Sequence, residues 1–209
     1  MCGTGSYCGL VSTRASSAIK KPPAKRRNTR PEKTIRKLLD ATIEELRQSS
    51  YLDLTVRGVA SRAGVSPASA YKYFPSKSAL VADAYLRQLQ DVPMFTDVNQ
   101  SARERVSATL REMAFVVADH PEMAAACANA LISDDPGVEP ARMKIAAEVG
   151  QRISAALGPG WPREVVTIIQ MTFNGALITA KGGYLSYPQI AEHLDEAVRL
   201  ILRAPNINP

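Results

Sequence analysis

The segment from residue 55 to residue 77 predicts two short helices joined by a tight turn, and this spacing constrains the fold more than any other feature. Thr55 is a residue type that can cap and begin the first helix. Gly64 can adopt the left-handed conformation that ends such a helix and turns the chain. Ser66 and Pro67 are favoured at the cap and at the first position of the next helix. The segment therefore predicts a helix-turn-helix.

The two short helices share an apolar side and leave a polar side facing outward. The shared apolar wedge is predicted to consist of Val56, Val59, Ala60, Val65 and Ala70. Small apolar side chains can contact a thymine methyl group and a lysine can donate to guanine, which predicts base contacts for Pro67, Ala68, Ser69 and Lys72. Hydroxyl and ammonium groups can fix the register on phosphates, which predicts phosphate contacts for Thr55, Tyr71, Tyr73 and Lys77.

Positive charge is concentrated near the N-terminus. Residues 1–37 hold ten basic residues and one acidic residue, whereas residues 38–209 hold 16 basic and 19 acidic residues. A basic end on a mildly acidic body is typical of a chain that meets a polyanion at one end. Residues 1–30 lack apolar periodicity and are predicted to form a flexible basic arm. Such an arm can reach a minor groove or adjacent phosphates, or it can serve only as a solubilising tail.

Apolar residues elsewhere recur at three- and four-residue intervals, which indicates amphipathic helices. Gly and Pro separate the helical patterns, and no useful stretch alternates as a strand would. The sequence therefore predicts an all-α fold of about nine helices. The predicted parts are the arm at 1–30, a helix-turn-helix DNA-binding domain at 31–75, a linking helix at 76–90 and a larger helical domain at 91–205.

The chain lacks the residue patterns of a metal site or an enzyme. Its three cysteines and two histidines have no ligand spacing. A Gly-rich phosphate loop and a nucleophile elbow are also missing. We therefore expect no catalytic residues, no metal and no cofactor, with a helical enzyme as the less favoured alternative. The cysteine usage, with no signal peptide or membrane-spanning stretch visible, leads us to expect a cytoplasmic protein that does not meet a membrane.

The run from Leu54 to Leu80 resembles the DNA-binding domain of the tetracycline-repressor (TetR-like) family. The resemblance is carried by Thr55, Val59-Ala60, Ala63-Gly64-Val65, Tyr71, Tyr73-Phe74, Lys77 and Leu80. It covers about residues 33 to 90, and beyond them only length and helical character agree. The resemblance implies a homodimer whose recognition helices enter successive major grooves of a palindromic operator. It also implies a ligand pocket in the C-terminal domain and repression that the ligand relieves.

The last two long helices are candidates for the dimer interface, because paired helices from two subunits can form a four-helix bundle. One apolar stripe consists of Val165, Val166, Ile169, Thr172, Phe173, Ala176 and Leu177. The other consists of Ile190, Leu194, Ala197, Val198 and Ile201. The alternative is that both stripes face the core of their own protomer. This half carries an excess of acidic residues, so it is not expected to bind nucleic acid.

A ligand pocket should be mostly apolar with a few polar groups. The candidate lining residues are Phe95, Phe115, Met123, Cys127, Met143, Trp161, Phe173 and Asn174. The lack of basic residues from Val165 to Ala180 favours a neutral, apolar ligand. We therefore expect a ligand-responsive transcriptional regulator that acts as a repressor. A DNA-binding regulator controlled by a protein partner is the alternative, and the lack of a cavity of about 300 Å³ would favour it.

Overall fold

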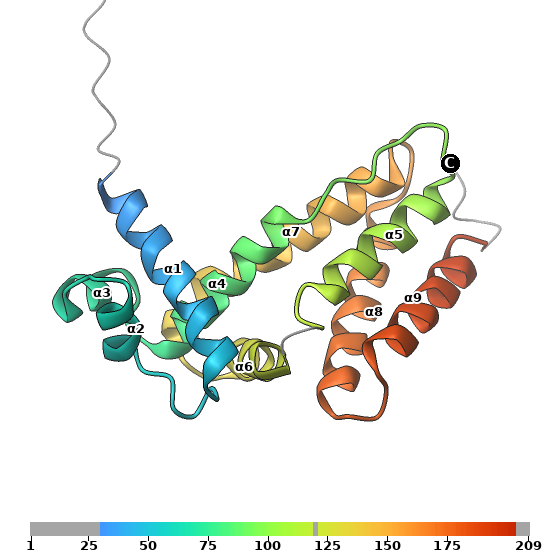
Figure 1. Ribbon diagram of the computed structural model, residues 1–209. Helices are drawn as coiled ribbons and strands as arrows, with labels where there is room; N and C mark the ends of the chain where they lie inside the picture. The colour runs from blue at the N-terminus through green and yellow to red at the C-terminus, as the bar shows by residue number, and fades with distance from the viewer. Residues whose placement is uncertain (1–29, 119–120, 204–209) are drawn as a thin grey trace, which may run out of the picture.

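The computed structural model describes residues 30–118 and 121–203, and all regular secondary structure within these ranges is helical (Figure 1). The elements are α1 (Arg30–Gln48), α2 (Val56–Arg62), α3 (Pro67–Tyr73), α4 (Lys77–Asp91), α5 (Ala102–Phe115), α6 (Pro121–Ile132), a short 3₁₀ helix η1 (Pro136–Val138), α7 (Glu139–Leu157), α8 (Arg163–Lys181) and α9 (Tyr187–Ile201). The prediction of an all-α fold is confirmed for these residues. The predicted basic arm, apart from its last residue, lies outside them. No helix within the described ranges is both long enough and apolar enough to cross a membrane.

The short helices begin and end where their capping residues lie. The side-chain hydroxyls of Thr55, Ser66 and Ser76 each accept a hydrogen bond from the backbone N–H three residues later, at 3.0, 3.3 and 3.1 Å. Each such cap stabilises a helix by about 1 kcal/mol. Gly64 has a φ of +63°, which an L side chain adopts only with strain, so it turns the chain between α2 and α3. The predicted helix-turn-helix is therefore present.

Helices α1, α2 and α3 pack around a small apolar core at one end of the molecule (Figure 1). Four of the five predicted wedge residues are buried, and the fifth, Val65, is half-buried. Phe74 is buried directly after α3 and completes this core. Tyr73 is half-buried and packs against this core, whereas Pro67, Ala68, Tyr71 and Lys72 of α3 are exposed.

Helix α4 is buried along most of its length, because it packs against α1 on one side and against α6 and α7 on the other. Its buried residues are Ala79, Leu80, Val81, Ala82, Ala84, Tyr85, Leu86 and Leu89. Such a helix shows apolar residues around most of its circumference rather than along one stripe. In Figure 1, α4 and α7 run between the end formed by α1–α3 and the end formed by α5, α8 and α9.

The C-terminal end of α4 is held by a buried arginine on α7. Arg152 is only 5% exposed, and its guanidinium donates to the carbonyl oxygens of Val92 at 2.6 Å and of Gln90 at 3.0 Å. The same guanidinium forms an ion pair with Glu148 at 2.7 Å. These bonds satisfy carbonyl groups that the end of a helix leaves without partners. The position of α4 is therefore tied to that of α7.

Half of the residues in the two stripes that were candidates for a dimer interface face the core of their own protomer. Val165, Ile169 and Phe173 are buried on α8, and Ile190, Leu194 and Val198 are buried on α9, where these helices pack against α5, α7 and each other. For these six residues the interface assignment is wrong and the alternative holds, whereas the other six are partly exposed, namely Val166, Thr172, Ala176, Leu177, Ala197 and Ile201. A different set of apolar side chains on α8 and α9 is exposed, namely Ile168, Met171, Ile178 and Leu200.

Replacing Arg152 with Met is expected to lower the free energy of unfolding by about 3 kcal/mol, because the carbonyls at the end of α4 and the Glu148 carboxylate lose a buried partner. The matched control is Arg103→Met. Arg103 forms an exposed ion pair with Asp195 at 3.1 Å, so its loss should change stability by less than about 1 kcal/mol. Urea denaturation of both variants measures the difference, and equal effects would contradict an anchoring role for Arg152.

Candidate functional site

Helix α3 carries most of the predicted DNA-contacting residues on its outward side. The exposed or partly exposed residues of this side are Pro67, Ala68, Ser69, Tyr71, Lys72 and Tyr73. Ala70 lies on the opposite side and is completely buried against the rest of the three-helix core. The outward side of α3 therefore combines small side chains with one lysine and two phenol groups. This combination can approach base edges closely while the hydroxyls reach the backbone phosphates.

Thr55 and Lys77 also make contacts within the protein. The Thr55 hydroxyl caps α2 as an acceptor, and its own proton is still available to a phosphate. The Lys77 ammonium donates to the carbonyl oxygens of Tyr51 at 2.9 Å and of Leu52 at 3.3 Å. It also lies 4.4 Å from the centre of the Tyr51 ring. Lys77 therefore joins α4 to the segment that precedes α2, and one of its three protons is left for an external partner.

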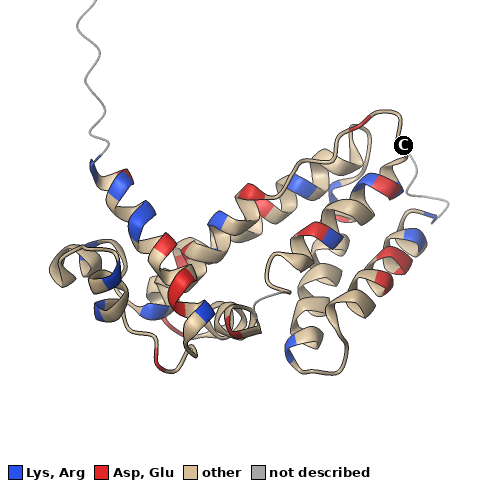
Figure 2. Cartoon of the chain, viewed as in Figure 1, with Lys and Arg blue, Asp and Glu red and all other residues tan. Residues whose placement is uncertain are grey.

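A basic groove of about 370 Å³ lies between the first turns of α1 and the turn that precedes α3. Its lining residues are Arg30, Lys33, Thr34, Lys37, Gly64, Val65, Ser66 and Ser69. Lys33 and Lys37 are four residues apart, so both lie on the same side of α1. Figure 2 shows basic residues along these turns of α1. No acidic residue lines the groove, which is therefore suited to a phosphate beside α3.

Lys33 and Lys37 belong to the basic N-terminal region of the sequence, but no contact was predicted for either of them. Their four-residue spacing just before the apolar positions of α1 could have shown that they project from a folded helix. That they face the turn before α3 depends on how α1 packs against α2, which spacing alone does not reveal.

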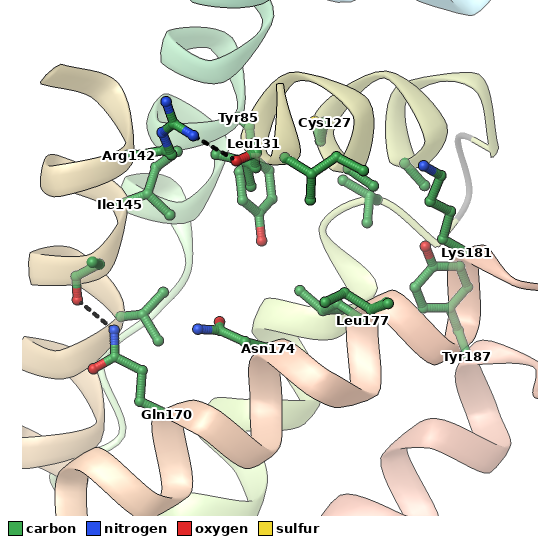
Figure 3. Close-up of a pocket in the computed structure, with 17 residues that line it drawn as sticks. Tyr85, Cys127, Leu131, Arg142, Ile145, Gln170, Asn174, Leu177, Lys181 and Tyr187 are labelled. Atoms are coloured by element: carbon green, nitrogen blue, oxygen red, sulfur yellow. Dashed lines mark hydrogen bonds between the residues drawn. The ribbon is translucent and has the colours of Figure 1, made fainter. Parts of the chain in front are cut away.

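A cavity of about 400 Å³ lies between α4, α6, α7 and α8 (Figure 3). Its inner wall is formed by buried side chains, namely Tyr85, Val117, Cys127 and Val149. Its outer edge is formed by exposed side chains, which include Ile132, Asn174, Ile178 and Lys181. Aliphatic side chains make up most of the remaining lining. The volume and the composition match those of cavities that bind small organic molecules.

Only two of the eight predicted pocket residues line this cavity, Cys127 and Asn174. The six that do not are Phe95, Phe115, Met123, Met143, Trp161 and Phe173. Met123 and Phe173 belong to the packed core, whereas Met143 is 64% exposed. The lining residues were predicted from the size and type of their side chains. Whether a side chain lines the cavity depends instead on the helix face from which it projects. Phe173 lies on the core face of α8, and its neighbour Asn174 points into the cavity (Figure 3).

Two cations line the cavity, and none of its lining residues is acidic. Arg142 donates to the carbonyl oxygen of Leu131 at 3.2 Å, and its Nε lies 3.2 Å from a carboxylate oxygen of Glu139 without hydrogen-bond alignment. Lys181 donates to the amide oxygen of Asn129 at 2.6 Å. The absence of basic residues from 165 to 180 therefore does not make the cavity free of positive charge.

The ionisable groups of the inner wall are held in their neutral forms. Burial raises the pKa of the Cys127 thiol to about 12. Burial, followed by the nearby Cys127 and Tyr187, raises the pKa of the Tyr85 hydroxyl far above its ordinary value. At neutral pH the cavity therefore presents a thiol and a phenol rather than a thiolate and a phenolate. Within the described ranges, no group of three or more His, Cys, Asp or Glu residues could hold a metal ion.

Comparison with known proteins relates this arrangement to one family. Residues 38–84 match the family profile described as bacterial regulatory proteins, tetR family. An HTH-type transcriptional regulator of Mycobacterium tuberculosis is 47% identical over 182 residues, which cover 86% of this chain and 85% of that protein. The sequence relationship thus extends through both the helix-turn-helix and the region that holds the cavity.

Solved structures show the same fold. A TetR transcriptional regulator from Rhodococcus sp. RHA1 superposes with a TM-score of 0.73 at 21% identity, covering 84% of this chain and 99% of that chain. Thermus thermophilus FadR, a TetR-family repressor solved in complex with lauroyl-CoA, superposes with a TM-score of 0.65 at 16% identity, covering 84% and 96%. At these identities the likeness concerns the fold alone.

Cys127 is expected to react slowly with iodoacetamide in the folded protein, because only about one thiol in ten thousand is ionised at pH 8 when the pKa is about 12. The rate should rise about tenfold per pH unit between about pH 7 and pH 10, since the pKa lies above this range. Mass spectrometry on a Cys2→Ser/Cys8→Ser variant isolates this thiol. The same variant unfolded in guanidinium is the control, and rapid alkylation of the folded form at pH 8 would contradict the burial.

Proposed function

Because the chain belongs to the tetracycline-repressor (TetR) family of bacterial regulatory proteins, we propose that it is a dimeric repressor that binds a palindromic operator and is released by a small molecule. Members of this family are transcriptional regulators rather than enzymes. The observation that carries the proposal is the placement of α4, which connects the helix-turn-helix to the wall of a cavity of about 400 Å³.

We assign DNA recognition to α3 and backbone binding to the basic groove. Pro67 and Ala68 can contact thymine methyl groups, and Lys72 can donate to guanine in the major groove. Lys33 and Lys37 lie beside α3 and can bind a phosphate, which adds affinity without reading sequence. Because few polar groups on α3 can read bases, DNA shape contributes much of the specificity. Of the two roles that the sequence leaves open for the basic arm, DNA contact and a solubilising tail, we assign it the first.

We assign dimer formation to the exposed apolar side chains of α8 and α9. Ile168, Met171 and Ile178 follow one line along α8, and Met171 is 68% exposed in the protomer. Exposed apolar side chains that gather in this way mark interaction surfaces. Paired with their copies, the two helices form a four-helix bundle. These helices lie at the end away from α3 (Figure 1), so the bundle leaves both recognition helices free to bind half-sites about 34 Å apart.

We assign effector binding to the cavity and the response to α4. Tyr85 brings α4 into the cavity wall, and on the other side of α4, Arg87 forms an ion pair with Asp40 of α1 at 2.7 Å. A ligand that prefers one position of α4 shifts the population of the α1–α3 arrangements. The lauroyl-CoA complex of Thermus thermophilus FadR supports the use of this fold for a small organic ligand. A cavity larger than about 300 Å³ also weighs against control by a protein partner alone.

Replacing Lys72 with Met is expected to weaken binding to the operator by about tenfold while changing binding to unrelated DNA little, because the residue reads a base. A Lys33→Gln/Lys37→Gln variant should bind both DNAs more weakly. The plot of the logarithm of the association constant against the logarithm of the salt concentration should become less steep by about 1 to 2. Fluorescence anisotropy at several salt concentrations, with an operator located by footprinting next to the gene, measures both effects.

The control for these variants is Lys144→Gln. Lys144 is an exposed lysine of α7, and α7 is distant from α3 in the sequence. This control should leave affinity and slope unchanged. DNA binding that does not respond to salt, or that survives all three substitutions in α1 and α3, would exclude the proposed DNA interface.

An Ile168→Asp/Met171→Asp variant is expected to sediment as a monomer and to bind the operator at least about tenfold more weakly, because two charges would be buried in the bundle. Val98→Asp is the control, since Val98 is also a highly exposed apolar residue but lies in the α4–α5 connection. Analytical ultracentrifugation distinguishes the two. A variant that stays dimeric would place the interface elsewhere.

A further inference from the structure

The innermost polar group of the cavity is the Tyr85 hydroxyl, and it makes no hydrogen bond to any residue that the structure describes. Tyr85 is only 3% exposed, and its ring extends from α4 so that the hydroxyl points into the cavity (Figure 3). Its neighbours on the inner wall, Val117, Cys127 and Val149, offer no strong acceptor side chain. Among the described residues, only Arg142 Nε is a fully enclosed side-chain nitrogen or oxygen without a partner, so the Tyr85 oxygen is open to the cavity. Its hydrogen-bond partner therefore comes from the contents of the cavity.

Most other polar groups of the cavity are engaged or lie at its exposed edge, apart from the half-buried Tyr187 hydroxyl and the buried Nε of Arg142. The Nη1 of Arg142 donates to the carbonyl oxygens of Leu131 and Ser133. The Gln170 amide donates to the carbonyl oxygen of Ala146 at 2.9 Å. Lys181 and Asn174 are exposed at the outer edge, and Lys181 already donates to an amide oxygen. With no carboxylate in the lining, the cavity offers nothing to neutralise a cationic ligand. Among the buried residues of the lining, Tyr85 is the one whose hydroxyl is free to donate from α4, and Val117 and Val149 beside it are apolar.

We propose that the effector is an uncharged, largely apolar molecule with one oxygen acceptor, a ketone or ester carbonyl, which accepts a hydrogen bond from the Tyr85 hydroxyl. This inference rests on the proposed role of the cavity as the effector site. A carboxylate that met Tyr85 alone, away from Arg142 and Lys181, would lose its hydration for a single hydrogen bond, whereas a carbonyl loses far less. Because burial keeps Tyr85 protonated, the hydroxyl remains a donor at every physiological pH.

The same hydroxyl discriminates against pure hydrocarbons. In the free protein, water in the cavity can hydrogen-bond to Tyr85, and a hydrocarbon that displaces this water leaves the hydroxyl without a partner. A carbonyl compound replaces the lost hydrogen bond. Sites built around a buried polar group reject analogues that lack the matching group for this reason. The hydroxyl also belongs to α4, so the bond that selects the ligand acts directly on the helix that contacts α1.

Four probes with the same carbon frame test this selectivity: butylbenzene, benzylacetone, phenylbutanoate and phenylbutylamine. Their binding to the full chain without DNA is measured by calorimetry. Benzylacetone should bind about fivefold or more tighter than butylbenzene, and phenylbutylamine should bind most weakly. The Tyr85→Phe variant should bind benzylacetone more weakly and butylbenzene more tightly than the unmodified chain does. The preference for benzylacetone over butylbenzene should therefore nearly disappear. Tyr184→Phe is the matched control, because Tyr184 is 83% exposed and does not line the cavity.

Three results would overturn the inference. One is equal binding of benzylacetone and butylbenzene to the unmodified chain, and another is the failure of every probe to bind at millimolar concentration. The third is tightest binding of phenylbutanoate that Lys181→Gln abolishes and Tyr85→Phe leaves intact, which would place an anionic group at the outer edge. Because DNA is absent, these results leave the operator experiments untouched, and loss of operator binding would leave the probe preference measurable.

Discussion

The structure depends on the burial of α4, because this helix lies in a single apolar core that runs from α1 to α9. One side of this helix completes the core of α1–α3, and the other side packs against α6 and α7. Both of its ends are also held by cations. Lys77 donates to carbonyls before α2, and Arg152 donates to the carbonyls where α4 ends. Interiors packed to this density transmit a displacement rather than absorb it. A shift of α4 relative to α7 would therefore also displace α1, against which α2 packs, and through them the proposed recognition helix α3.

Features that depend on neighbouring residues in the sequence could be predicted better than features that depend on the packing of distant helices. The helix-turn-helix could be predicted in detail because short-range rules determine it: the caps Thr55 and Ser66, the left-handed Gly64 and the apolar wedge each act within a few residues. The basic groove could be predicted only in part, since its lysines are visible in the sequence but their position beside α3 is not. That position requires the packing of α1 against α2.

Helix α8 shows why the cavity and the interface could not be predicted. Its core face carries Ile169 and Phe173, its cavity face carries Asn174, and its open face carries Ile168 and Met171. All three faces are rich in apolar residues, so periodicity does not rank one above another. Which face is buried, which lines a cavity and which is left open depends on α7 and α9. Residue size was therefore a poor guide, and the cavity is lined mainly by aliphatic residues and by Tyr85 from α4.

The chemistry of α3 bears on how a small ligand could release the DNA. If Lys72 is the main polar base reader of each protomer, as we propose, most of the binding free energy comes from phosphate contacts made by two protomers together. Joining two half-sites through a rigid dimer raises affinity by about 10²–10⁴ over a single contact, provided that both recognition helices fit at once. A ligand need not dismantle either surface. In the proposed dimer, a movement of α4 that changed the spacing of the two α3 helices would remove the joint contribution, and it would require only that the ligand prefers the altered spacing.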